Sequence, residues 1–243
     1  MNDFQSGNQP YKQPWQDGSW ERAQPRTAAD ATVAERMGFI RKVYSLFFAA
    51  ILFAIGGVMI GFAFPPLMIA AAEHPWIALL VLIGGVFGAQ AVRHVPGLNL
   101  FALFGFTTLT GIVISPLLYI IGQTNPASIL QAGVLTVGIF GGLTAYVFIS
   151  RKDFSFLRGM VTVGLIVVVL AAFLNALIIG SSAMGFAISA ATLLLFSGFV
   201  LYDTSNIIRR YPTNEYVAGA LDLYLDAFNI FLALLRLLNA SRD

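Results

Sequence analysis

The chain has 243 residues, of which 58% are hydrophobic and only 11% are charged, whereas about 25% of the residues in a typical soluble domain are charged. The formal net charge of +2 is too small to indicate a nucleic-acid partner, and the absence of cysteine excludes disulfides and thiolate sites. Apolar runs of about 20 residues recur along the chain, and each is long enough to cross a lipid bilayer. The sequence therefore predicts an all-α, multi-pass membrane protein.

Residues 1–36 are predicted to form a disordered cytoplasmic tail, and residues 37–243 a helical bundle. The tail is rich in Gln, Pro, Asp and Arg, with Trp15 and Trp20 as bulky interruptions. Such a composition buries too little apolar surface to fold alone, and it lacks the apolar core of a signal peptide. The alternative is that the two tryptophans make the tail a docking segment.

Seven apolar segments follow and predict seven transmembrane helices, at residues 40–64, 76–93, 98–122, 127–150, 157–180, 183–208 and 219–238. Lys and Arg indicate the orientation, because they are in excess on the cytoplasmic side of membrane proteins. Twelve of the fourteen basic residues belong to the tail, to the start of the first helix, or to the second, fourth and sixth connections. The other three connections contain none, so the N-terminus is predicted to be cytoplasmic.

The end of the chain differs from the rest because it carries acids. Across residues 43–200 the only carboxylates lie in predicted loops, whereas Asp203, Asp222 and Asp226 lie within or beside apolar helical runs. An acid in a spanning helix is costly and normally faces the bundle interior or a wet cavity. We therefore expect the last helix to be shielded by the other six, either as a central crossing helix, which would place the C-terminus outside, or as a re-entrant one.

Two of these acids have matching predicted depths. Asp203 lies six residues inside the end of the sixth helix, about 9 Å, and Asp226 lies seven residues inside the start of the seventh, about 10 Å. Asp222, Asp226 and Asn229 share one face of the last helix because their spacing is i, i+4, i+7. Asp222 is nearer the interface, where it is either solvated or a supporting member of the site. A purely structural role, in bonding a neighbouring helix, is the alternative for Asp203 and Asp226.

Four stretches carry a resemblance to a known family. They are FIRKVYSLFFAAIL (39–52), FGFTTLTGIVISPLLY (104–119), TAYVFISRKDFSFLRG (144–159), and the closing LYDTSNII with LDLYLDAFNIFLALLRLL. In this order and spacing, residues 38–238 resemble a bacterial version of the Bax inhibitor-1 family, the transmembrane Bax inhibitor motif proteins. The resemblance implies a seven-helix bundle in the cell (inner) membrane, with the last helix in its centre.

The same resemblance implies a function and a site. Family members are associated with a pH-sensitive calcium leak, in which an aspartate pair on the sixth and seventh helices senses pH. The LYD and LYLD motifs carry that role onto Asp203 and Asp226. The family's arginine partner comes from the second helix, and Arg93 is the only basic residue near that helix. Some bacterial members also associate with a membrane-bound ATP-dependent protease.

The chemistry of the pair follows from proximity. Two carboxylates in a low-dielectric site cannot both ionise easily, so they would titrate together. A shared proton could close a gate between the two helices, and deprotonation would leave repelling charges that separation, Arg93 or a cation relieves. Thr204 and Asn206 add neighbouring oxygens, but calcium needs six to eight. Asp203 and Asp226 therefore predict at most a weak Ca2+ site, with calcium as a passing ion and no tightly bound cofactor.

The function predicted from the sequence is a pH-sensitive calcium (cation) leak channel in contact with the lipid bilayer, Ca2+ and H+. The alternative is a non-conducting regulator that binds a membrane protease or a stress-response partner. A proton-coupled transporter is a third possibility, but the sequence has no evident internal repeat. Metalloprotease, serine hydrolase, P-loop and dinucleotide motifs are all absent from the sequence, so no enzymatic activity is predicted.

Overall fold

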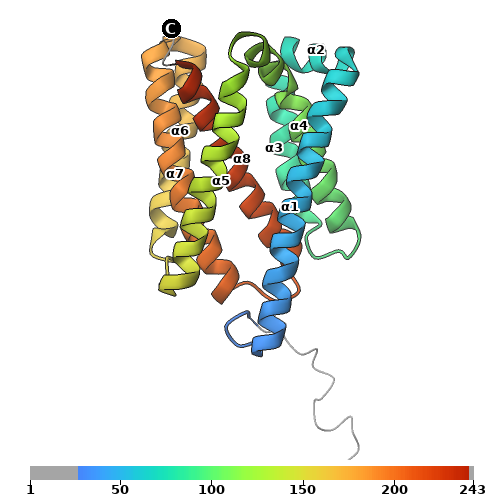
Figure 1. The fold of residues 1–243 in the computed structure, drawn as a ribbon, viewed down its shortest axis with the longest axis vertical. Helices are drawn as coiled ribbons and strands as arrows, with labels where there is room; N and C mark the ends of the chain where they lie inside the picture. Colours follow the sequence, from blue (N-terminus) through green and yellow to red (C-terminus); the bar gives the residue numbers. More distant parts are fainter. Residues whose placement is uncertain (1–26, 241–243) are drawn as a thin grey trace, which may run out of the picture.

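The computed structural model describes residues 27–240, which form a bundle of α-helices (Figure 1). The elements are α1 (Val33–Ala63), α2 (Pro65–Glu73), α3 (Pro75–Ala91), α4 (Leu98–Thr124), α5 (Pro126–Ser150), α6 (Leu157–Leu174), the π-helical turn η2 (Asn175–Ile179), α7 (Ser182–Arg209) and α8 (Tyr216–Ala240). Six helices are long and apolar enough to cross a membrane, and a seventh span results if α2 and α3, bent by 99°, are counted together. The predicted all-α membrane class is confirmed.

The short helix α2 was not predicted from the sequence. Its nine residues begin at Pro65 and none of them is buried. Proline is well suited to the first turn of a helix, where its missing N–H needs no partner. Pro75 and Pro126 begin α3 and α5 in the same way. The prolines between the predicted segments therefore start helices here as well as ending them.

The first helix begins earlier than the predicted domain boundary at residue 37. Thr32 caps α1, because its hydroxyl oxygen accepts the Glu35 N–H at 3.3 Å while the Glu35 carboxylate accepts the Thr32 N–H at 2.9 Å. This reciprocal arrangement satisfies two backbone donors at the helix start. Residues 27–36 are therefore folded, and the rest of the predicted tail, including Trp15 and Trp20, lies outside the described residues.

The segment before α1 is bound to the connection between α7 and α8. The Ala28 N–H donates to the Tyr211 carbonyl at 2.9 Å, and the Ala29 N–H donates to the Arg209 carbonyl at 3.2 Å. An isolated β-bridge between Thr27 and Pro212 continues the contact. The start of the described chain therefore lies against the turn that leads into the last helix.

Among the candidate spans, α8 is the most enclosed. Of its apolar window 67% is buried, against at most 33% in each of the other five. It packs against α1, α5 and α7 and runs obliquely from the end of the bundle where α1 begins to the opposite end (Figure 1). A helix surrounded in this way can carry side chains that lipid would not tolerate.

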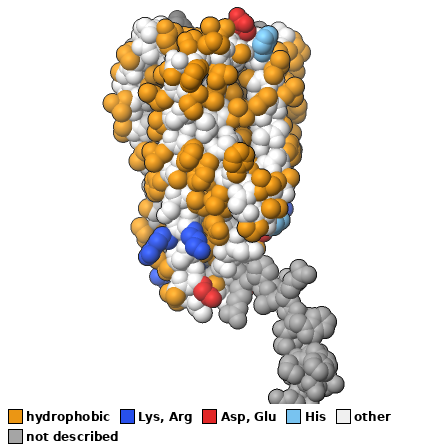
Figure 2. Space-filling model, turned by 90° about the vertical axis from the view of Figure 1, so that its right-hand side faces the viewer, with side chains coloured by type: hydrophobic (Ala, Val, Ile, Leu, Met, Phe, Trp, Pro, Cys, Tyr) orange, Lys and Arg blue, Asp and Glu red, His pale blue; other side chains and the backbone are white. Residues whose placement is uncertain are grey.

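The outer surface is apolar. Large hydrophobic side chains are exposed along the helices, for example Leu52, Phe87 and Leu130, which are 67%, 71% and 72% exposed. Figure 2 shows hydrophobic side chains along the length of one face, with Lys and Arg side chains near one end. Such an apolar belt suits contact with the hydrocarbon chains of a bilayer. The chain is therefore a multi-pass membrane protein.

Candidate functional site

Asp203 on α7 and Asp226 on α8 are brought together. Asp226 is only 2% exposed and Asp203 is partly buried, and the two carboxyl groups are close enough to share a hydrogen bond. Such a bond requires a proton on one of them. Without that proton, Asp226 Oδ2 is a buried oxygen that has no hydrogen-bond partner among the described residues. The two carboxyl groups therefore lie where α7 and α8 pack against each other.

Asp222 belongs to the same cluster. Its carboxylate accepts a hydrogen bond from the Tyr211 hydroxyl, and it interacts with the Gln90 side chain and with the positive charge of Arg93. Its own charge acts repulsively on Asp203 and Asp226. The structure therefore places the half-buried Asp222 in contact with polar partners from the α7–α8 connection and from α3, and the interpretation as a merely solvated residue does not fit this position.

Arg93 reaches the cluster through Asp222. It follows the end of α3 and is exposed, and the acid in the cluster that feels its charge is Asp222. Its Nε donates to His94 Nε2 at 3.0 Å, and His94 Nδ1 lies 3.5 Å from the Glu215 carboxylate. Arg93 therefore links the α3–α4 connection to the start of α8, and it lies beside the predicted aspartate pair without contacting it directly.

Tyr211 is a member of the site that the sequence did not indicate. It lies between α7 and α8, where burial and the neighbouring Asp222 charge raise its pKa far above the usual value for tyrosine. The hydroxyl therefore remains protonated at any physiological pH and remains a donor to Asp222. Since the Tyr211 carbonyl accepts the Ala28 N–H, this residue joins the segment before α1 to the cluster.

The predicted supporting residues divide into two groups. Thr204 is fully buried, and its hydroxyl faces those of Tyr44 on α1 and Thr144 on α5. None of the three oxygens has a hydrogen bond of good geometry within the described region. Asn229, by contrast, donates its side-chain N–H to the Leu225 carbonyl of its own helix at 2.8 Å. The Asn229 amide, which was predicted to contribute to the polar face, therefore bonds the backbone of its own helix.

Asn206 contributes through its backbone. Its carbonyl accepts the N–H groups of both Arg210 and Tyr211, at 2.7 Å and 3.0 Å, where α7 ends. These two bonds set the direction in which the chain leaves α7 toward the cluster. Among the predicted supporting residues, Asp222 is the one that joins the aspartate pair by its side chain.

On another face, α8 is held by a second polar contact. The hydroxyl groups of Tyr224 and Thr110 on α4 are hydrogen-bonded and buried. The Tyr224 ring also stacks on Phe228, with centroids 5.7 Å apart, and meets Phe106 edge-on at 6.4 Å. Two hydroxyl groups can hydrogen-bond without gaining or losing a proton, whereas two carboxyl groups need a shared proton. The Tyr224–Thr110 contact is therefore not expected to change with pH.

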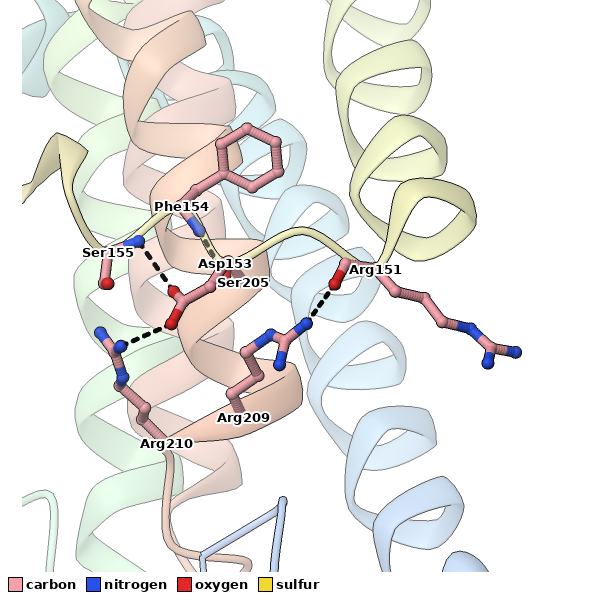
Figure 3. Close-up of polar contacts among 7 residues, drawn as sticks. All are labelled: Arg151, Asp153, Phe154, Ser155, Ser205, Arg209 and Arg210. Carbon is pink, nitrogen blue, oxygen red and sulfur yellow. Dashed lines mark hydrogen bonds and ion pairs between the residues drawn. The ribbon is translucent and has the colours of Figure 1, made fainter.

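The end of α7 below Asp203 is fastened to the α5–α6 connection (Figure 3). The Ser205 hydroxyl accepts the Phe154 N–H at 3.1 Å, and the Arg209 guanidinium donates to the Arg151 carbonyl. Arg210 Nη2 and Asp153 Oδ2 form an ion pair at 2.8 Å. The pKa of Asp153 lies below its usual value because the Ser155 backbone N–H and the Arg210 charge stabilise the carboxylate.

The cluster offers few ligands to a metal ion. In the part of the chain that the structure describes, no three His, Cys, Asp or Glu residues are arranged around a common point as ion ligands. Asp203, Asp226 and nearby hydroxyl groups supply fewer than the six to eight oxygens that calcium prefers.

Comparison with known proteins identifies relatives over most of the chain. A family model described as "Inhibitor of apoptosis-promoting Bax1" matches residues 36–243. An uncharacterised membrane protein of Vibrio cholerae is 43% identical over 179 residues, covering 72% of this chain and 79% of the relative. Protein lifeguard 4 of Mus musculus is 34% identical over 215 residues, covering 87% and 89%. A Golgi anti-apoptotic protein of Vaccinia virus is 30% identical over 218 residues, covering 88% and 90%.

Proposed function

Because this chain belongs to the Bax inhibitor-1 family, we propose that it is a pH-sensitive calcium leak channel of the cell membrane. The observation that carries the proposal is the contact between Asp203 and Asp226 on adjacent helices. An intramembrane carboxylate is costly and usually serves transport or sensing. Two of them in contact, with a third charge from Asp222 nearby, form a proton-dependent link between α7 and α8.

The proposed gate works through one shared proton. With the proton present, the carboxyl groups of Asp203 and Asp226 bond and hold α7 against α8. After deprotonation, both groups are charged in a low-dielectric interior, and their repulsion is relieved when the helices separate or a cation enters. Asp222 increases this repulsion, while Tyr211, Gln90 and Arg93 hold Asp222 itself in place. Calcium would pass as cargo, coordinated only in part by protein oxygens.

The proposed topology has seven crossings, with α2 and α3 together as the second and α8 in the centre. Two observations support it: the burial of α8 and the basic residues on alternate connections. By the excess of Lys and Arg on the cytoplasmic side, the start of α1 faces the cytoplasm. In a bacterial cell this membrane would be the inner membrane.

Flux through reconstituted protein tests the gate. The protein in liposomes with an enclosed calcium dye should leak more calcium at about pH 8 than at about pH 6, because a higher pH favours loss of the shared proton. In Asp203→Asn or Asp226→Asn, the amide donates to the remaining carboxylate at any pH, so the leak should stay low throughout. Absence of flux, or the same pH profile in all three proteins, would contradict the proposal.

A second candidate is a non-conducting regulator that binds a membrane protease or another stress-response partner. The observation that favours it is the bonding of Ala28 and Ala29 to the α7–α8 connection, since this joins the start of the described chain to the loop that carries Tyr211. The vaccinia relative, named as anti-apoptotic, is also compatible with a regulatory role. Deletion of residues 2–26 separates the two functions: loss of partner binding with unchanged flux would assign the tail to binding. Neither candidate involves catalysis.

A further inference from the structure

A cavity of about 440 Å³ lies between the beginning of α1, the end of α5 and the end of α7. Four basic side chains line it: Arg36, Arg151, Lys152 and Arg209. The remaining wall is mainly apolar and includes Ile40 and Phe148. The cavity therefore combines a cluster of positive charge with a hydrocarbon-like surface.

No acid lines the cavity beside these four basic side chains. The ion pairs found between residues 27 and 240 are Arg210–Asp153 and His94–Glu215. Asp153 is thus paired outside the cavity, and Figure 3 shows the Arg151 side chain extending away from that pair. The Glu35 carboxylate, which accepts the Thr32 N–H, does not line the cavity. Like charges held around one space repel, and a bound anion removes the repulsion.

The position of the cavity favours a lipid as the source of that anion. It lies among basic residues at the beginning of α1 and at the ends of α5 and α7, and its wall includes apolar residues of α1 and α5. A free phosphate ion would make no favourable contact with the apolar wall, whereas a phospholipid presents a phosphate and a hydrocarbon chain together. Basic pockets between helices on the cytoplasmic side are suited to anionic head groups, and guanidinium groups bind phosphate through paired hydrogen bonds.

We propose that this cavity binds an anionic glycerophospholipid, with its phosphate among Arg36, Arg151, Lys152 and Arg209 and an acyl chain along the wall of Ile40 and Phe148. The bound lipid bridges three helices that no ion pair joins at this point. Because Arg209 and Ser205 belong to both the cavity and α7, the lipid also holds the segment that follows Asp203. The binding itself does not depend on calcium conduction.

Lipid binding to the full chain in a neutral detergent tests the proposal. Native mass spectrometry with phosphatidylglycerol or phosphatidylcholine should show retention of one phosphatidylglycerol, with weaker binding of phosphatidylcholine. The double variant Arg151→Gln/Lys152→Gln should bind phosphatidylglycerol about thirtyfold more weakly, since each basic residue near an anionic lipid contributes about a factor of five. Arg36→Gln should weaken binding about fivefold. All three side chains are partly or fully exposed, so the variants should fold.

The matched control is Arg158→Gln, which removes an exposed basic residue at the same end of the bundle that does not line the cavity. It should bind phosphatidylglycerol as the unmodified chain does. Equal binding of both lipids, or equal weakening by Arg158→Gln, would overturn the proposal in favour of unspecific attraction. Protection from thermal unfolding by inorganic phosphate that equals the effect of phosphatidylglycerol would also overturn it, because the site would then be a simple anion site.

Discussion

Helices α1 and α4 pack closely against each other, and so do α7 and α8, but the two contacts differ in chemistry. The first is formed by glycines and backbone, whereas the second includes carboxyl groups. In the first, a Cβ atom at Gly57 would overlap the Thr108 carbonyl, and one at Gly111 would overlap the Ala54 carbonyl. Backbones that approach so closely are held by dispersion along their whole length. This contact has one geometry and no charge, so pH does not alter it.

The α7–α8 contact is conditional. Gly219 allows α8 to approach Ile207 on α7. About one turn earlier on α7 and two turns later on α8, the contact includes the carboxyl groups of Asp203 and Asp226. Their interaction changes sign when the shared proton leaves, from a hydrogen bond to a repulsion. If the proposed gate operates, the α1–α4 contact stays rigid while the α7–α8 contact responds to pH.

The largest expected effect comes from a substitution that disrupts the α1–α4 contact. In Gly57→Ala the new Cβ meets the Thr108 backbone, which cannot turn away as a flexible side chain would. We expect the free energy of unfolding to fall by about 3 kcal/mol, measured by thermal unfolding in detergent. Gly56→Ala is the control, because a Cβ at this neighbouring position meets nothing within 4 Å. A similar loss in both variants would show that helix conformation, and not close approach to α4, requires the glycine.

The second prediction compares amide hydrogen exchange at the α7–α8 contact with exchange at the α1–α4 contact. Amide hydrogen exchange, corrected for the intrinsic effect of pH, should become about fivefold faster in residues 219–229 of α8 between about pH 6 and pH 8, because loss of roughly one hydrogen bond weakens the contact by about 1 kcal/mol. Residues 50–61 of α1 should show no such change. Asp226→Asn should abolish the change in α8. Equal acceleration in both helices would contradict a local gate.

Sequence reasoning identified the spans and the unusual acids for clear physical reasons. A bilayer requires long apolar runs, and an acid such as Asp226 in such a run stands out against them. The helix α2 was missed because nine residues are too short to leave that signal. Tyr211 was missed because a tyrosine in a loop has no distinctive pattern, and its position depends on how α8 turns back into the bundle. Regular spacing placed Asn229 on the polar face, but spacing cannot show that its side chain bonds its own backbone.

A smaller effect compares two buried tyrosines. Tyr44 has a buried hydroxyl without a well-formed hydrogen bond, whereas the Tyr224 hydroxyl is bonded to Thr110. Removal of an unpaired buried polar group relieves its desolvation, so Tyr44→Phe should raise the free energy of unfolding by about 1 kcal/mol. Tyr224→Phe should lower the free energy of unfolding by about 1 kcal/mol, because it removes the hydrogen bond between the Tyr224 and Thr110 hydroxyl groups. Equal destabilisation by both would indicate that water bonds the Tyr44, Thr144 and Thr204 hydroxyl groups.

The smallest effect concerns the fastening of α7 outside the membrane. The Arg210–Asp153 ion pair is about half exposed on both sides, with side chains 49% and 45% accessible, so Arg210→Gln should lower the free energy of unfolding by only a few tenths of a kcal/mol at neutral pH. The pKa of Asp153 is lowered from its ordinary value of 3.8. The stabilisation is therefore fully present above that value and is lost as pH falls through the lower pKa of the folded state. Thermal unfolding of both proteins should converge once the pH is low enough to protonate Asp153 in the folded state, and also in high salt. A difference that persists there would mean that Arg210 acts through packing of its side-chain stem, and that this end of α7 is held as independently of charge as the α1–α4 contact.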